Sequence, residues 1–157
     1  MPDAAADRPA RERGLLALVY VSTATESIGR AEEPVPLLIG WRAHNASVGI
    51  SGVLLAKDGD LCQYLEGTEP AMTLLYAHIC VDRRHRGVIE LLREPIERRE
   101  FPEWPLAFFC AQSYHETRML PTEEFGRTLF DPRAASRSAG HALLTAFWQA
   151  GRTDASG

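Results

Sequence analysis

The side chain with the clearest chemical demand is Gln63, an uncharged amide in a segment that otherwise has the pattern of a buried strand. Gln63 lies between Leu61 and Leu65, and side chains in a strand alternate with a period of two. The amide should therefore share the face of these two leucines. A buried amide left without a hydrogen-bond partner costs about 1–3 kcal/mol. The sequence thus predicts a polar partner for Gln63 inside the fold.

Further polar side chains are expected on the same side of the sheet. Tyr20 and Ser22 lie at the end of the first apolar run, residues 15–21, and Asn45 lies on a helix predicted over residues 37–47. His78 and Asp82 are four residues apart on a second predicted helix, so they share a face. The expected polar set therefore comes from two strands and two helices.

Several common chemistries are weakly supported. No serine or cysteine has a histidine and an acid at motif spacing, no glutamates pair on one helix face, and there is no glycine-rich phosphate loop. The three cysteines, Cys62, Cys80 and Cys110, are odd in number and not at metal-ligand spacing. We predict buried free thiols, no metal site and no catalytic residues.

Charge and hydropathy argue against two classes of partner. The net charge is −4 without a large basic block, which disfavours direct binding to nucleic acid. No apolar run approaches the roughly 20 residues that span a bilayer, and the first 13 residues lack the core of a secretory signal. The predicted location is the cytoplasm, with no membrane contact.

The order of predicted elements favours an α+β fold. Strands are predicted over residues 15–21, 49–56, 61–67, 88–92 and 104–110, and helices over residues 37–47 and from Thr68 to about Gly87. Right-handed crossovers then give a ferredoxin-like βαββαββ sheet, mixed and five-stranded, with both helices on one face. The first and third strands should be adjacent, parallel and central, so that Tyr20 neighbours Gln63. Trp104, Leu106 and Phe108 should share a face of the last strand.

The chain divides into three predicted parts. Residues 1–14 form a disordered tail, residues 15–110 a compact domain, and residues 111–157 a helical extension. Within the extension, residues 122–129 could form a short helix, and residues 138–150 form a better one. Its apolar stripe consists of Leu143, Leu144, Phe147 and Trp148. The stripe is predicted to cover the sheet face opposite the two helices, with a subunit or partner interface as the alternative.

The polar set suits a flat heteroaromatic ligand. A tyrosine and two amides can donate to and accept from the imide edge of such a ring. The slot between the helices would place apolar side chains such as Leu37, Leu38 and Leu75 on the faces of the ring. Because tyrosine is oxidisable, a ligand made strongly oxidising by light could draw an electron from Tyr20.

An ordered set of motifs resembles BLUF domains, the blue-light sensors that use FAD. The resemblance covers residues 15–109 and is specific as a set rather than in any one fragment. The motifs are LVYVS at 18–22, AHNA at 43–46, GISGVLL at 49–55, QYLEG at 63–67, DRRH at 82–85 and RREFPEW at 98–104.

The resemblance implies a noncovalent FAD site and a role for each matching residue. The photochemical tyrosine falls on Tyr20, the switching glutamine on Gln63 and the asparagine at a flavin carbonyl on Asn45. The full set of implied FAD-binding residues is Tyr20, Ser22, His44, Asn45, Gln63, His78 and Asp82. Signal output is implied for Trp104 and for Leu106, which replaces a methionine of the family.

The resemblance also implies a photoreceptor rather than an enzyme. Tyr20 would supply an electron and a proton by way of Gln63, and their return would leave Gln63 rotated or tautomerised. A stronger hydrogen bond to the flavin carbonyl would then shift the absorption to the red. No cyclase or phosphodiesterase domain is recognisable, so a downstream protein partner in trans is implied, and a homo-oligomer is possible.

Two other functions remain open from the residues alone. The first is a flavin-free ferredoxin-like interaction module, against which the set of Tyr20, Asn45 and Gln63 argues, and the colour of the purified protein separates the two. The second is a small flavin oxidoreductase, which would turn over a reductant steadily in the dark.

Overall fold

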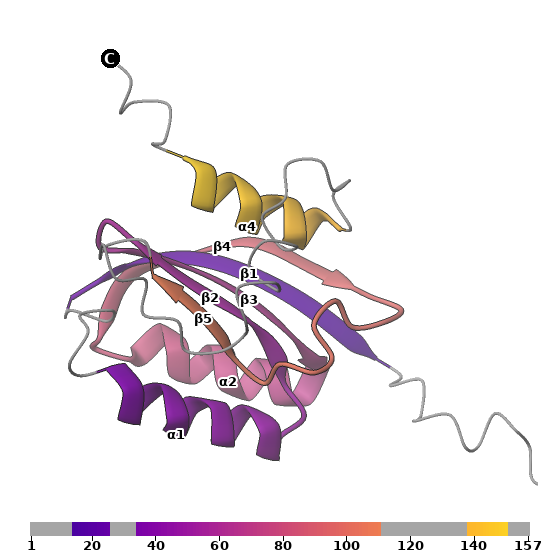
Figure 1. Ribbon diagram of the computed structural model, residues 1–157. Helices are drawn as coiled ribbons and strands as arrows, with labels where there is room; N and C mark the ends of the chain where they lie inside the picture. Colours follow the sequence, from indigo (N-terminus) through magenta and orange to yellow (C-terminus); the bar gives the residue numbers. More distant parts are fainter. Residues whose placement is uncertain (1–13, 26–33, 111–137, 151–157) are drawn as a thin grey trace, which may run out of the picture.

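A five-stranded sheet in the order β4-β1-β3-β2-β5 forms the middle layer of the molecule (Figure 1). The structure is a computed structural model, and it describes residues 14–25, 34–110 and 138–150. The expected tail and the expected helix over 122–129 lie outside the described residues, apart from Gly14. The elements are β1 (Leu15–Ala24), α1 (Pro34–Ser47), β2 (Ser51–Lys57), β3 (Asp60–Thr68), α2 (Glu69–Val81), β4 (His85–Pro95), β5 (Ala107–Cys110) and α4 (Ala139–Gln149).

The two central strands are β1 and β3, as predicted, but the prediction that they run parallel is wrong. They pair antiparallel, with Tyr20 directly opposite Gln63. The crossover through α1 joins β1 to β2, and β3 lies between these two strands and pairs antiparallel with both. A hairpin turn at Asp58 and Gly59, both at positive φ, reverses the chain from β2 to β3.

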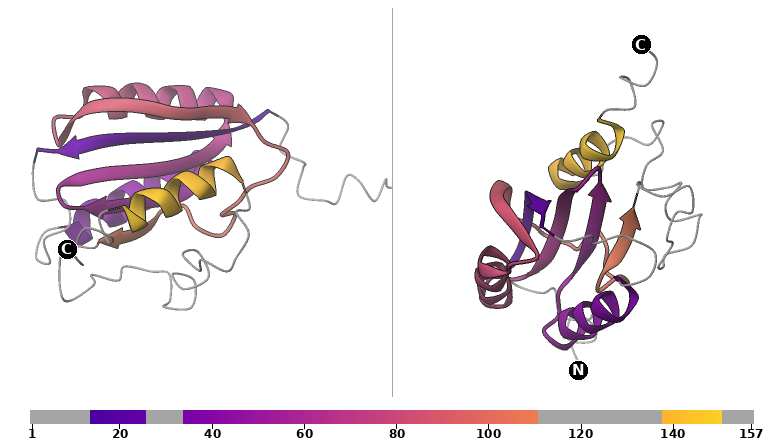
Figure 2. Two further views of the ribbon diagram at one scale, coloured as in Figure 1. Left: turned by 90° about the horizontal axis from the view of Figure 1, so that it is seen from above. Right: turned by 90° about the vertical axis from the view of Figure 1, so that its left-hand side faces the viewer.

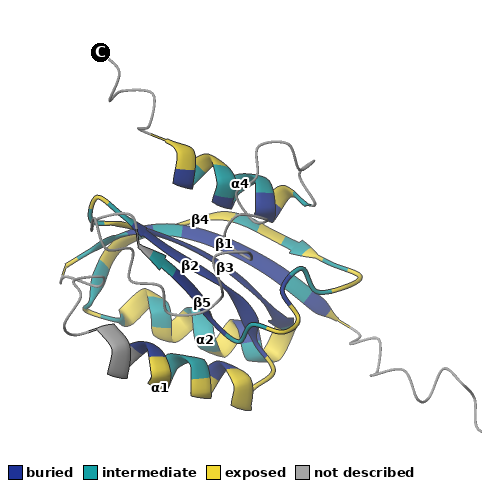
Figure 3. Cartoon of the chain, viewed as in Figure 1, coloured by how far each residue is buried: buried dark blue, intermediate teal, exposed yellow. Residues whose placement is uncertain are grey.

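The helix-side face carries the side chains that the period of two predicted. Leu18 and Tyr20 of β1 lie in one buried cluster with Leu65 of β3 and Met72 of α2. The predicted stripe of α2 packs there as well, through Ala71, Leu75 and Ile79. In Figure 3 the inner strands β1, β3 and β2 are largely buried, whereas the outer surfaces of both helices and much of the edge strand β4 are exposed.

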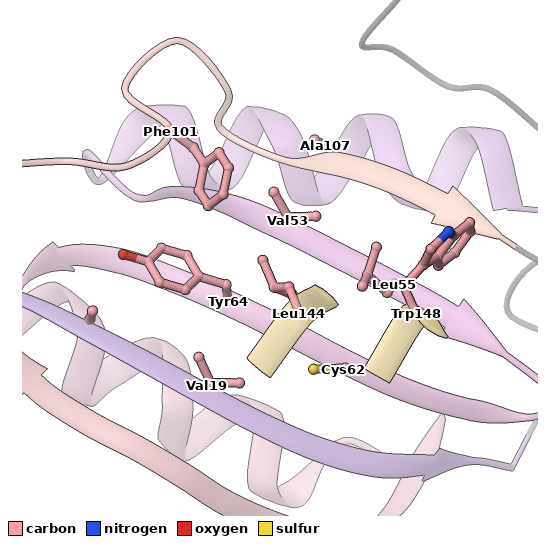
Figure 4. Packing of buried hydrophobic residues seen from close by; sticks show 10 residues of the cluster. Val19, Val53, Leu55, Cys62, Tyr64, Phe101, Ala107, Leu144 and Trp148 are labelled. Carbon is pink, nitrogen blue, oxygen red and sulfur yellow. The ribbon is translucent and has the colours of Figure 1, made fainter. Parts of the chain in front are cut away.

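The opposite face of the sheet is covered by α4, which confirms the predicted position of the C-terminal stripe. Leu144 and Trp148 are buried among Val19, Leu55 and Tyr64 (Figure 4). Leu143 and Phe147 pack against the same cluster. Figure 2 shows α1 and α2 on one side of the sheet and α4 on the other. Among the described residues, no helix is long and apolar enough to cross a membrane.

The start of β5 differs from the prediction. The strand begins at Ala107 rather than at Trp104, because Pro105 has no N–H to donate and interrupts the strand pattern. Trp104 therefore does not follow the period of Leu106 and Phe108. Trp104 packs on the α4 side of the sheet, whereas Leu106 and Phe108 are buried on the α1 side.

The second helix and β4 also have different bounds from those predicted. The helix ends at Val81 instead of continuing towards Gly87, and β4 starts at His85 and runs for 11 residues. The cysteine prediction is only partly right. Cys62 is buried and burial raises the pKa of its thiol to about 12, but Cys80 is exposed on α2.

A buried carboxylate that the sequence analysis did not single out holds the loop before β5. Glu66 of β3 is fully buried and accepts hydrogen bonds from the hydroxyls of Ser51 (2.8 Å) and Tyr64 (3.0 Å). It also accepts from the backbone N–H groups of Glu100 (2.7 Å) and Phe101 (2.8 Å). Four donors thus satisfy the charge, as a buried carboxylate requires.

The contact between Gly140 of α4 and the ring of Tyr64 gives a first prediction. A Cβ at position 140 would lie 2.2 Å from Cε2 of Tyr64, so Gly140→Ala should lower the free energy of unfolding by about 1–3 kcal/mol. Gly40, inside α1, has nothing within 4 Å of such a Cβ. Gly40→Ala should therefore raise the free energy of unfolding by about 0.5–1 kcal/mol. Urea unfolding of both variants makes the comparison, and equal stabilities would contradict the packing of α4.

Candidate functional site

A cavity of about 310 Å³ lies between α1 and α2, above the two central strands. Its volume is at the lower end of the range for small-molecule sites, roughly 300–1,000 Å³. Residues from both helices, from β1, β2 and β3, from the connection between α2 and β4 and from the start of β4 line it. They are Tyr20, Trp41, His44, Asn45, Leu54, Leu61, Gln63, Leu75, His78, Ile79, Asp82, Arg84 and His85.

Two of the predicted site residues form one hydrogen-bonded pair beside this cavity. The hydroxyl of Tyr20 donates to Oε1 of Gln63, and both side chains are buried. The antiparallel register places the two residues directly opposite each other. The partner that the buried amide requires is therefore the phenol of Tyr20.

Tyr20 is held in its neutral, donating form. Burial raises the pKa of the phenol far above its usual value, and the nearby Cys62 and Asp82 raise it further. The phenol consequently keeps its proton over the physiological range. Among the described residues, no other hydrogen bond engages the Gln63 amide, so its nitrogen can donate to a ligand in the cavity that Gln63 lines.

Asn45 is the second amide of the cavity and is set in place by its own backbone and by the segment before β5. The main-chain carbonyl oxygen of Asn45 accepts from the N–H of Ile50 at 2.8 Å, where the chain leaves α1. Its side-chain Nδ2 donates to the carbonyl of Pro105 at 2.9 Å. Asn45 is buried, so its remaining donor and its Oδ1 can act on a ligand.

The other predicted helix residues also reach the cavity. His44 on α1 and His78 on α2 are exposed side chains that line it. Asp82 lines it just after α2, where its carboxylate accepts from the backbone N–H of Arg84 (2.9 Å) and pairs with the Arg84 guanidinium (3.0 Å). The site thus brings together six of the seven predicted residues.

Ser22 is the predicted residue that does not line the cavity. Its hydroxyl lies 2.8 Å from Nδ1 of His85, and Nε2 of His85 lies 2.6 Å from the carbonyl of Ile79. A carbonyl only accepts, so Nε2 carries a proton, and in the neutral ring Nδ1 accepts from Ser22. Ser22 therefore acts on the cavity through His85, whose ring lies 6.0 Å from that of Tyr20.

Arg84 and His85 line the cavity but were assigned no role from the sequence, although both belong to the DRRH motif. Trp41 lines it as well, and its i, i+4 spacing to Asn45 predicts that the two share a face of the helix. The Arg84 guanidinium lies 5.8 Å from the centre of the Trp41 ring, which joins α1 to the connection after α2.

Neither residue predicted for signal output lines the cavity, and only Leu106 lies next to it. Leu106 is buried with Leu38 and Leu54, and Leu54 lines the cavity. Trp104 lies on the other face of the sheet. Of the three predicted apolar ring contacts, Leu75 lines the cavity, Leu38 lies in the cluster with Leu106, and the side chain of Leu37 is outside the described residues.

The donor set fits a flat heteroaromatic ring and does not suggest a metal. Leucine and isoleucine side chains form apolar walls, while two amides, a phenol and a carboxylate supply hydrogen bonds. Among the described residues, no three histidine, cysteine, aspartate or glutamate side chains gather as metal ligands. An isoalloxazine ring, which is flat and carries carbonyl and imide groups on one edge, matches this arrangement.

Comparisons with known proteins agree with this fit. The family model "Sensors of blue-light using FAD" matches residues 15–107. Photoactivated adenylate cyclase subunit beta of Euglena longa is 38% identical over 93 residues, which are 59% of this chain and 11% of that protein. The blue light- and temperature-regulated antirepressor BluF of Escherichia coli is 30% identical over 95 residues, covering 60% of this chain and 23% of that protein.

Solved structures give the same fold. The dark-state structure of BlrB, a BLUF protein, has a TM-score of 0.60 at 24% identity and covers 91% of this chain and 90% of that one. Klebsiella pneumoniae BlrP1, in a complex with manganese and cyclic di-GMP, has a TM-score of 0.69 at 26% identity, covering 87% of this chain and 33% of that one. This chain thus spans about a tenth of the cyclase subunit and a third of BlrP1. The chain belongs to the BLUF family, the sensors of blue light that use FAD.

Proposed function

We propose that this chain is a blue-light sensor that holds FAD noncovalently between α1 and α2 and reports light through the Tyr20–Gln63 pair. The observation that carries the proposal is the hydrogen bond from a neutral, buried phenol to the amide of a cavity-lining glutamine. The proposed ligands of the flavin are Tyr20, Asn45, Gln63, His44, His78 and Asp82, with Ser22 acting through His85.

Gln63 can act as a switch because its side chain has two ends of similar shape and opposite hydrogen-bonding character. With Oε1 towards Tyr20, the amide accepts from the phenol and its nitrogen donates into the cavity. Rotated by half a turn, the nitrogen would donate to the phenol oxygen and the carbonyl would face the cavity. The rotation thus exchanges a donor for an acceptor at the ligand with little change in volume.

Tyr20 supplies the driving event of the proposed switch. When bound, the flavin absorbs blue light and provides an excited state able to oxidise a nearby phenol. Tyr20 would then give an electron to that oxidant and pass its phenolic proton along the hydrogen bond to Gln63. Both would return to Tyr20, so nothing would be consumed and only the orientation or tautomer of Gln63 would change.

In this proposal the described residues sense light and do not turn over a substrate. The one carboxylate that lines the cavity, that of Asp82, is paired with the Arg84 guanidinium. The relatives pair related segments with long further sequences, some of them named as adenylate cyclases, and this chain matches only a small share of their length. We propose that a separate protein partner receives the signal, and cytoplasmic location stays a prediction.

The switch predicts the behaviour of two variants loaded with FAD. Tyr20→Phe removes the phenolic donor and Gln63→Leu removes the amide, while both keep most of the volume. Each should retain FAD and lose the reversible red shift of flavin absorption on blue illumination. Tyr76→Phe is the matched control, because its ring lies 6.1 Å from that of Tyr20 and it should keep the shift. A normal red shift in Tyr20→Phe would disprove the assigned role.

Burial of the phenols predicts how stability depends on pH. Burial raises the pKa of Tyr20 and Tyr64 in the folded state, whereas an unfolded tyrosine ionises near pH 10. Above that pH the folded state binds more protons, so the free energy of unfolding should fall by about 1.4 kcal/mol per pH unit for each phenol. The stabilisation that the raised pKa of each phenol provides is fully present below pH 10.

Urea unfolding between pH 8 and pH 11 measures this dependence. Tyr20→Phe lacks one of the two phenols and should show a shallower decline above pH 10 than the unchanged protein. Equal declines in the two proteins would mean that the Tyr20 phenol is not kept protonated by the fold.

A further inference from the structure

The segment just before β5 is held by hydrogen bonds to three consecutive carbonyl groups. The carbonyl of Trp104 accepts from the N–H of Gly52 on β2 at 2.9 Å. The carbonyl of Pro105 accepts from Nδ2 of Asn45 at 2.9 Å. The carbonyl of Leu106 accepts from Nε and Nη2 of Arg42 at 3.2 and 3.1 Å. Only the first of these donors belongs to the sheet.

The other two donors come from one face of α1. Arg42 and Asn45 are three residues apart, so their side chains lie next to each other on the helix. The helix and the segment before β5 are separated by about 60 residues in sequence, yet these two side chains join them. Two side chains of α1 therefore hold the backbone at Pro105 and Leu106 to the helix.

The two contacts differ in their relation to the cavity. Asn45 lines the cavity, so its hydrogen bonds depend on what the cavity holds. Arg42 does not line the cavity and is half-buried. Its guanidinium gives the carbonyl of Leu106 two donors from a permanent charge, and such bonds are stronger than those between neutral groups. One contact can thus respond to the ligand while the neighbouring one stays constant.

We propose that Arg42 is a positioning residue that tethers the segment before β5 to α1 and limits how far β5 responds to light. The inference rests on the proposed function. When the hydrogen bonds of Asn45 change in the light state, Pro105 is freed to shift, and the bond from Arg42 to Leu106 holds the next residue in place. Arg42 thereby sets the amplitude of the change that reaches β5.

Hydrogen–deuterium exchange of the FAD-loaded chain, in the dark and under blue light, tests the tether. Arg42→Met keeps the aliphatic stem and removes all donors, so residues 107–110 should exchange about tenfold faster in the dark. The ratio of light to dark exchange in residues 107–110 should also rise, by roughly threefold or more. Flavin content and the dark absorption spectrum should not change, because Arg42 is not a cavity residue.

Two further variants separate a tether from a merely structural contact. Arg42→Lys keeps one charged donor group and should restore part of the dark protection and lower the ratio again. Arg86→Met makes the same change at an exposed position on β4 and should leave both quantities as in the unchanged protein. A structural contact alone would raise exchange equally in light and dark.

The outcomes distinguish this inference from the proposed function. If the unchanged protein shows a red shift but Arg42→Met has the same light-to-dark ratio as the unchanged protein, only the tether is wrong. The tether is also wrong if Arg86→Met raises the light-to-dark exchange ratio as much as Arg42→Met does. If the unchanged protein shows no red shift, the proposed function fails and the tether fails with it.

Discussion

The hydrogen bond between Tyr20 and Gln63 is the contact on which the helix side of the sheet depends. Both groups are buried, and leaving either unpaired would cost about 1–3 kcal/mol. A slip of one residue between β1 and β3 would turn Gln63 towards α4 and break this pair. The same bond thus fixes the register of the two central strands and the position of the cavity above them.

The sheet separates two layers with different chemistry. On the α1 and α2 side, polar groups from both central strands meet a cavity with apolar walls. On the α4 side, the core is apolar around Leu144 and Trp148, and the buried carboxylate of Glu66 anchors the loop before β5. Trp104 and Leu106 lie on opposite faces, so the few residues between this loop and β5 contact both layers.

The patterns that could be predicted from sequence were those set by local periodicity. The period of two placed Tyr20 and Gln63 on one face, and the helical stripe of α4 predicted its cover of the sheet. The antiparallel direction of β1 and β3 was missed, since strand direction depends on which strands a crossover joins and not on any local pattern. The predicted start of β5 was wrong because it followed the apolar alternation of residues 104–108, although Pro105 interrupts the strand there.

The parts of the site that escaped prediction depend on contacts distant in sequence. The ring of His85 on β4 is hydrogen-bonded to the hydroxyl of Ser22 on β1. The guanidinium of Arg84 lies over the ring of Trp41 on α1. The carbonyl groups that Arg42 and Asn45 hold are about 60 residues away from α1. Main-chain acceptors carry no signature in the sequence, so such contacts become visible only once the fold is known.

The central claim is that light changes the hydrogen bonding of the Gln63 amide, and infrared difference spectroscopy measures that change directly. The FAD-loaded chain would carry isotope-labelled glutamine, and spectra in the dark and under blue light would be subtracted. We expect a glutamine amide carbonyl band that shifts on illumination, returns in the dark, persists in Gln149→Asn and is absent in Gln63→Leu. A glutamine carbonyl band that is identical in light and dark, in a protein that still shows the red shift, would contradict the claim.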